Sequence, residues 1–126
     1  MLLRAADGRA SGESNMNSVF HEELERRAVE IGRLCQQCHV LRLELFGSAT
    51  LDRFDLAHSD LDFLVCFREG CTSLDNYLPL ADGLEKLFRR PVDLVIERAV
   101  RNPYFSQTIN ATRRLIYEHR EQEAVV

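Results

Sequence analysis

The sequence lacks several features that would place a protein in a special class. No apolar run among its 126 residues is long enough to cross a bilayer, and its start lacks the apolar core of a secretory signal. There is no internal repeat and no excess of basic residues, since 16 Lys and Arg stand against 20 Asp and Glu. The net charge of -4 gives no general attraction for phosphate backbones. We therefore expect a cytoplasmic protein with no membrane partner and no direct contact to nucleic acid.

Cysteine is scarce as well, with four in the chain. Without an export signal they are expected to be reduced thiols and not disulfides. Cys35 and Cys38 continue an apolar helical stripe, and Cys66 alternates within a strand pattern. Packing is therefore favoured over a zinc or redox site that would add Cys71.

The length and composition predict one compact domain. Hydrophobic residues make up 45% and charged residues 29% of the chain, which is enough to bury a core. We expect residues 1–17 to be a flexible leader, with Met16 as an alternative start, and residues 121–126 to be a flexible tail. The folded domain is expected to span residues 18–120.

Hydrophobic periodicity predicts alternating helices and strands. One amphipathic helix is expected from Ser18 to Cys38, a second over Leu74–Phe88, and a short third one that begins after the N-cap Asn102. The second helix should bury a stripe that includes Leu74 and Leu78. Strands are expected at Leu41–Leu45, Leu61–Phe67 and Val92–Ile96, with a last extended piece at Leu115–Tyr117. The segment from Ala49 to Ser59 is expected to be a short helix or a loop, and the order αβαβαβα predicts an α/β fold.

Three aspartates interrupt the apolar strands. Asp62 lies inside Leu61–Phe67, and strand alternation turns Asp60 to the same side; Asp93 lies inside Val92–Ile96. Buried carboxylates without a partner are costly, although an arginine such as Arg90 could neutralise Asp93. If all three converge from adjacent strands, a divalent cation would neutralise them, and hard oxygen ligands favour Mg²⁺.

A Gly47–Ser48 pair follows the first predicted strand. Glycine lets the backbone approach a phosphate closely, and the serine hydroxyl with neighbouring N–H groups can donate hydrogen bonds to it. A triphosphate cradle beside a carboxylate cluster predicts metal-assisted phosphoryl chemistry that needs no protein nucleophile.

These motifs also resemble a known family. The motif from Phe46 to Ser48, followed after a short spacer by Ser59-Asp60-Leu61-Asp62, resembles the DNA polymerase beta-like nucleotidyltransferase superfamily. In particular it is similar to the small bacterial group called minimal nucleotidyltransferases. Two later motifs, from Arg90 to Val95 and from Arg101 to Tyr104, match that group too. The resemblance implies a single-domain nucleotidyltransferase fold, with a short mixed β-sheet flanked by helices.

The resemblance further implies which residues act. Gly47 and Ser48 would bind the triphosphate of ATP, Asp60 and Asp62 would hold Mg²⁺, and Asp93 would complete the metal site and assist deprotonation of the acceptor. Members of the group are antitoxins of HEPN-domain ribonuclease toxins, which they modify by attaching AMP to a tyrosine hydroxyl, and an oligomer with the toxin is possible. The alternatives are an antitoxin that only blocks the toxin sterically, or nucleotide transfer to a small molecule.

Overall fold

The fold is a small mixed sheet flanked by helices, as the sequence predicts. The computed structural model describes residues 18–47 and 60–119, and the elements below belong to these two ranges. In chain order they are α2 (Ser18–Arg26), α3 (Ala28–Gln37), β1 (Val40–Phe46), β2 (Leu61–Phe67), α4 (Leu74–Phe88), β3 (Val92–Ile96), the 3₁₀ turn η2 (Glu97–Ala99), α5 (Pro103–Thr112) and β4 (Arg114–Glu118). None of the helices in these ranges is long and apolar enough to cross a membrane.

The strand order places β2 inside the sheet. The four strands lie in the order β3-β2-β1-β4, with β2 and β3 parallel and the other pairs antiparallel. A parallel pair needs a long crossover connection, and α4 supplies it between β2 and β3. As a result, the strand that contains Asp62 has the strand that contains Asp93 as its direct neighbour.

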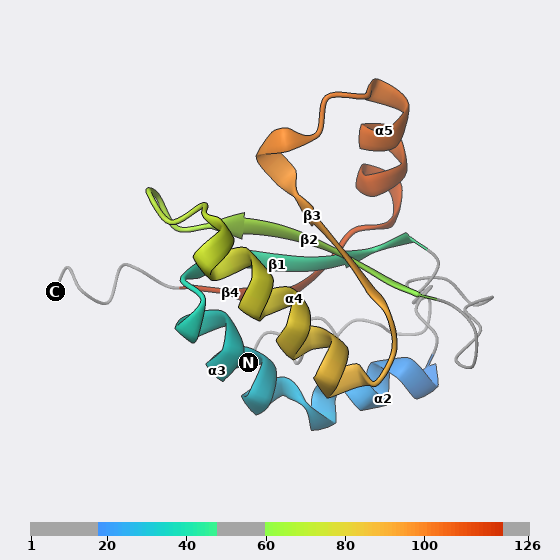
Figure 1. Cartoon of the computed structure of the whole chain (residues 1–126). Coiled ribbons are helices and arrows are strands. Elements are labelled where there is room, and N and C mark those ends of the chain that lie inside the picture. The colour runs from blue at the N-terminus through green and yellow to red at the C-terminus, as the bar shows by residue number, and fades with distance from the viewer. Residues whose placement is uncertain (1–17, 48–59, 120–126) are drawn as a thin grey trace, which may run out of the picture.

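The two faces of the sheet have different covers. On one face, α3 and α4 pack over the main core, whereas α5 lies on the opposite side (Figure 1). The alternation predicted for β2 is confirmed, because Phe63 and Val65 belong to the main core while Leu64 packs with Phe46 and Ile109 in a separate cluster. The α5 side therefore has a much smaller apolar cover, and Asp62 lies on that side with Leu64.

The predicted helix from Ser18 to Cys38 is in fact two helices. The break falls at Arg27, whose backbone leaves the helical region (φ -103°, ψ 10°). Leu24 before the break and Ile31 after it are both buried. The seven-residue spacing typical of one helix face thus runs across the bend, and periodicity carries no sign of it.

The predicted stripe on α4 is wrong at its start. Leu74 is 69% exposed and Leu78 is 57% exposed, while Leu80 and Leu84 are fully buried. Tyr77 takes the inward position instead, because its hydroxyl donates a 2.6 Å hydrogen bond to the carbonyl oxygen of Leu94 in β3. A tyrosine can thus pack its ring against the core and still satisfy its polar end.

The predicted N-cap of α5 and the predicted packing of Cys35 and Cys38 are confirmed. The Asn102 side chain accepts hydrogen bonds from the backbone N–H groups of Tyr104 and Phe105, at 2.8 and 3.3 Å, and so caps α5. All four cysteines lie in the described residues and are free. Cys35 and Cys38 are core residues, and burial raises the pKa of both thiols, which keeps them protonated.

Candidate active site

Asp62 and Asp93 are neighbours on one face of the sheet. They are paired in the register of the parallel strands β2 and β3, so both side chains project to the same side. Asp62 is half-buried in the middle of the sheet, whereas Asp93 on the outer strand is exposed. The ion pairs between described residues do not include Asp93.

Electrostatics connects Asp60 to this pair. Asp60 is exposed and directly precedes β2. Burial, together with the negative charges of Asp93 and Asp60, raises the pKa of Asp62 to about 6. Two like charges near a half-buried carboxylate disfavour its ionised form, which a nearby cation would restore. The fold therefore concentrates negative charge at one end of β2.

The cluster alone is not a closed metal cage. Within residues 18–47 and 60–119, no three His, Cys, Asp or Glu side chains form a group that could hold a metal ion by themselves. A cation at this position would therefore need ligands from elsewhere, such as the oxygens of a phosphate group.

Gly47 lies directly against Asp62. It follows β1, whose last residue Phe46 is paired with Asp62 across the strands. The backbone of Gly47 has φ +81°, and a Cβ atom on it would lie 2.6 Å from Oδ2 of Asp62. Both the conformation and the space exclude larger residues. Ser48, the second predicted phosphate ligand, lies outside the described residues.

A residue that sequence reasoning missed contacts this turn. The backbone N–H of Gly47 donates a 2.9 Å hydrogen bond to Oγ1 of Thr112, the last residue of α5. The two residues are 65 positions apart, so no local pattern could have indicated the contact. In this arrangement the Gly47 N–H already has an acceptor within the protein.

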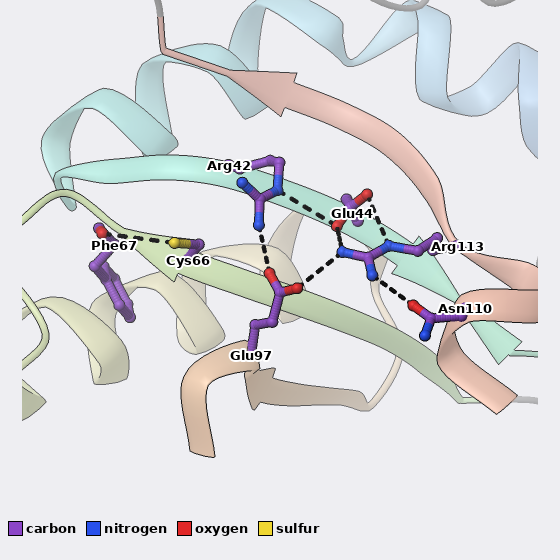
Figure 2. A network of polar contacts seen from close by, with 7 residues as sticks. All are labelled: Arg42, Glu44, Cys66, Phe67, Glu97, Asn110 and Arg113. Carbon is purple, nitrogen blue, oxygen red and sulfur yellow. Dashed lines mark hydrogen bonds and ion pairs between the residues drawn. The ribbon is translucent and has the colours of Figure 1, made fainter. Parts of the chain in front are cut away.

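A charged network is centred on Arg113, the residue that follows Thr112 (Figure 2). Arg113 donates to both carboxylate oxygens of Glu44, at 2.6 and 3.2 Å, and to Glu97 at 3.0 Å. It also donates to Asn110 at 2.7 Å, and Arg42 pairs with Glu97. Burial alone would raise the pKa of Glu97, but the hydrogen bonds and charges of Arg113 and Arg42 outweigh it and lower the pKa. The network ties the end of α5 to β1 and η2.

The open face also has a pocket. Its volume is about 240 Å³, and it lies between β2, η2 and α5 with Leu64, Ile109 and Ser106 among its lining residues. Leu64 follows Asp62 by two positions and faces the same way, so the pocket lies on the same face of the sheet as Asp62, although Asp62 does not line it.

Comparison with known families decides what this site belongs to. The family model described as "Polymerase beta, Nucleotidyltransferase" matches residues 30–122 of the chain. The chain belongs to this family. The match covers both aspartate-bearing strands and Gly47, and the protein is a nucleotidyltransferase enzyme.

Individual relatives agree with this family. A candidate protein adenylyltransferase of Methanocaldococcus jannaschii is 35% identical over 71 residues, which is 56% of this chain and 70% of the relative. A solved structure of a candidate minimal nucleotidyltransferase is 33% identical, with a TM-score of 0.58 over 74% of this chain and 92% of that one.

More distant neighbours share the fold. One is the MNT antitoxin in a complex with the tri-AMPylated HEPN toxin of Shewanella oneidensis, with 18% identity and a TM-score of 0.54 over 81% of this chain and 78% of that one. The predicted fold class, a small nucleotidyltransferase fold with a mixed sheet flanked by helices, is thus confirmed.

Proposed function

We propose that this nucleotidyltransferase transfers AMP from ATP, with the help of Mg²⁺, to a tyrosine hydroxyl of a HEPN-domain ribonuclease toxin, and thereby acts as its cytoplasmic antitoxin. The observation that carries the proposal is the register pair of Asp62 and Asp93, with Asp60 and the Gly47 turn beside it. The names of the relatives support the chemistry and the partner.

The residues present fit magnesium. Asp62 and Asp93 offer hard carboxylate oxygens on one side of the sheet, and Asp60 directly precedes β2. Burial and the negative charges of Asp93 and Asp60 raise the pKa of Asp62, and a cation would offset both effects. Mg²⁺ usually takes only one or two carboxylates from the protein and completes its shell with water and substrate phosphates. An open cluster of carboxylates suits that ion better than a closed cage.

The chemistry follows from these positions. The acceptor oxygen attacks the α-phosphorus of ATP, the bond to the bridging oxygen breaks, and pyrophosphate leaves. Bound Mg²⁺ would orient the triphosphate and neutralise charge on the leaving group. Asp93 is exposed beside Asp62, where its carboxylate can accept the hydroxyl proton of an approaching acceptor. Gly47 has no Cβ atom to come between its backbone and Asp62, so a phosphate could approach the backbone closely there.

A protein acceptor is favoured by the openness of the site. Asp93 and Asp60 are exposed, so a side chain of a partner protein can approach their carboxylates from solvent. The solved neighbours include a toxin-antitoxin complex with the ATP analogue AMP-PNP, at 18% identity and a TM-score of 0.53, which agrees with a nucleotide and a protein partner at one such fold.

The test is the intact mass of the cognate HEPN toxin after incubation with the purified protein, ATP and Mg²⁺. Asp60→Asn and Asp62→Asn should each abolish the mass gain of one or more AMP units. Asp82→Asn is a matched control, because Asp82 is exposed on α4, on the other side of the sheet, and pairs only with the exposed Lys86. It should behave like the unmutated protein.

The outcomes separate the alternatives. If both active-site variants still transfer AMP, the assignment of these carboxylates is wrong. A different outcome is that neither the unmutated protein nor the variants add AMP to the toxin, yet all of them inhibit the toxin equally without ATP. The protein is then better described as an antitoxin that blocks the toxin sterically. If AMP is found on a small molecule while the toxin stays unmodified, nucleotide transfer to a small molecule is favoured.

A further inference from the structure

We propose that Thr112 is a positioning residue that fixes the Gly47 turn against Asp62 and so sets the affinity for the triphosphate. This inference rests on the proposed transfer of a nucleotide from ATP, but it concerns a residue far from the aspartate motif in sequence. It begins with the hydrogen bond between the Gly47 N–H and Oγ1 of Thr112.

The Thr112 hydroxyl has only one possible arrangement here. Oγ1 lies 3.0 Å from the backbone carbonyl oxygen of Thr108 and 2.9 Å from the Gly47 nitrogen. A carbonyl oxygen can only accept, so the single hydroxyl hydrogen is directed to Thr108. The oxygen lone pair then accepts from Gly47, which fixes the direction of the Gly47 peptide.

Thr112 is itself held firmly. The next residue, Arg113, binds Glu44 through two of its nitrogens and Glu97 through one of the same two. Glu44 lies in β1 and is paired with Leu64 of β2. Gly47 directly follows β1, and Asp62 lies in β2, so these two strands position both residues. The end of α5 is thus fastened to the strands of the active site, and Thr112 transmits that position to the turn.

The position of the turn matters because space around Asp62 is minimal. The point where a Cβ atom of Gly47 would lie is 2.6 Å from Oδ2 of Asp62. A turn released from Thr112 can move toward or away from the carboxylate. Loss of one hydrogen bond corresponds to a change of about fivefold to tenfold in affinity.

The test compares three substitutions. Thr112→Val keeps the branched shape but cannot accept the Gly47 hydrogen bond, whereas Thr112→Ser keeps the hydroxyl. Thr108→Val is the matched control, since the Thr108 hydroxyl donates to the carbonyl of Tyr104 in the same way, one helical turn earlier, and Thr108 is exposed. If Thr112→Val and Thr108→Val lose affinity for ATP to the same extent, the loss reflects the stability of α5 alone.

Two readouts are measured on each variant. In the metal-free and nucleotide-free protein, hydrogen exchange of the Gly47 amide should be slow in the unmutated, Thr112→Ser and Thr108→Val proteins and at least fivefold faster in Thr112→Val. In the transfer assay, Thr112→Val should raise KM for ATP about fivefold to tenfold with less than a twofold change in kcat, and Thr112→Ser should restore it.

The results distinguish this inference from the proposed function. If Thr112→Val leaves both the Gly47 exchange and the KM for ATP unchanged, Thr112 does not position the turn. If exchange accelerates while the KM stays the same, the hydrogen bond exists but does not act on substrate. If the unmutated protein transfers no AMP, the proposed function fails, while the exchange experiment still decides whether Thr112 holds the turn.

Discussion

Asp62→Asn should stabilise the metal-free protein while it abolishes nucleotide transfer. Asparagine has the same shape but no charge to repel Asp60 and Asp93. The pKa of Asp62 rises from an ordinary 3.8 to about 6, and this difference corresponds to at most about 3 kcal/mol. Because the side chain is half-exposed, water screens part of the repulsion, and we expect a gain of about 1 kcal/mol.

The gain should depend on pH in a defined direction. The raised pKa means that the folded state binds the proton more tightly than the unfolded chain does. The unmutated protein therefore loses stability as the pH rises from 3.8 to about 6 and above, and the variant, which cannot titrate there, does not. The difference between the two should be absent below pH 3.8 and complete above about pH 7.

Thermal and urea unfolding in the presence of a chelator measures this effect. At pH 7.5 a gain of about 1 kcal/mol should raise Tm by about 3–6 °C. Asp82→Asn should change Tm by less than about 1 °C, because its ion pair with Lys86 is exposed. Adding Mg²⁺ with a non-hydrolysable ATP analogue should stabilise the unmutated protein and reverse the order. An Asp62→Asn variant that is less stable than the unmutated protein in chelator would refute the claim that these carboxylates repel one another.

Three further predictions follow from the packing and the charged network. Gly47→Ala should lose transfer and about 1–2 kcal/mol of stability in urea unfolding, because a Cβ atom would clash with Asp62 at φ +81°; full activity would contradict the close approach. Glu97→Gln should cost about 1 kcal/mol, and since the pKa of Glu97 is lowered, this contribution should be present above its ordinary value of 4.5 and lost as the pH falls below it; a pH-independent difference would argue against the ion pairs. Leu84→Ala should cost about 2–5 kcal/mol in urea unfolding because Leu84 is fully buried in the main core, and a loss below 1 kcal/mol would be inconsistent with that packing.

The sequence predicted those parts of the site that depend on local periodicity. Alternation along Leu61–Phe67 correctly assigned Asp62 and Leu64 to one face of the sheet. The apolar run Val92–Ile96 correctly predicted β3, the strand that contains Asp93. The chain alone could not give the register that makes Asp62 and Asp93 neighbours, because register depends on how α4 packs the two strands together.

Other features left no trace in the local pattern. The bend at Arg27 keeps the apolar spacing of a straight helix, so only the structure reveals it. Leu74 and Leu78 fit an amphipathic stripe but are exposed. Tyr77 takes the inward position instead, where its hydroxyl donates to the carbonyl oxygen of Leu94 in β3. The contact of Thr112 with Gly47 likewise joins distant segments. Long-range hydrogen bonds of this kind depend on the tertiary fold and cannot be predicted from residue spacing.

Transfer of AMP, and not of a terminal phosphate, from ATP to a partner protein can be tested directly with labelled ATP. The protein and its cognate HEPN toxin are incubated with Mg²⁺ and ATP that is labelled at either the α- or the γ-phosphate. Label from the α-phosphate alone should appear on the toxin, and Asp62→Asn should remove it. Label on the toxin from the γ-phosphate, or undiminished α-label with Asp62→Asn, would contradict AMP transfer by the carboxylate face.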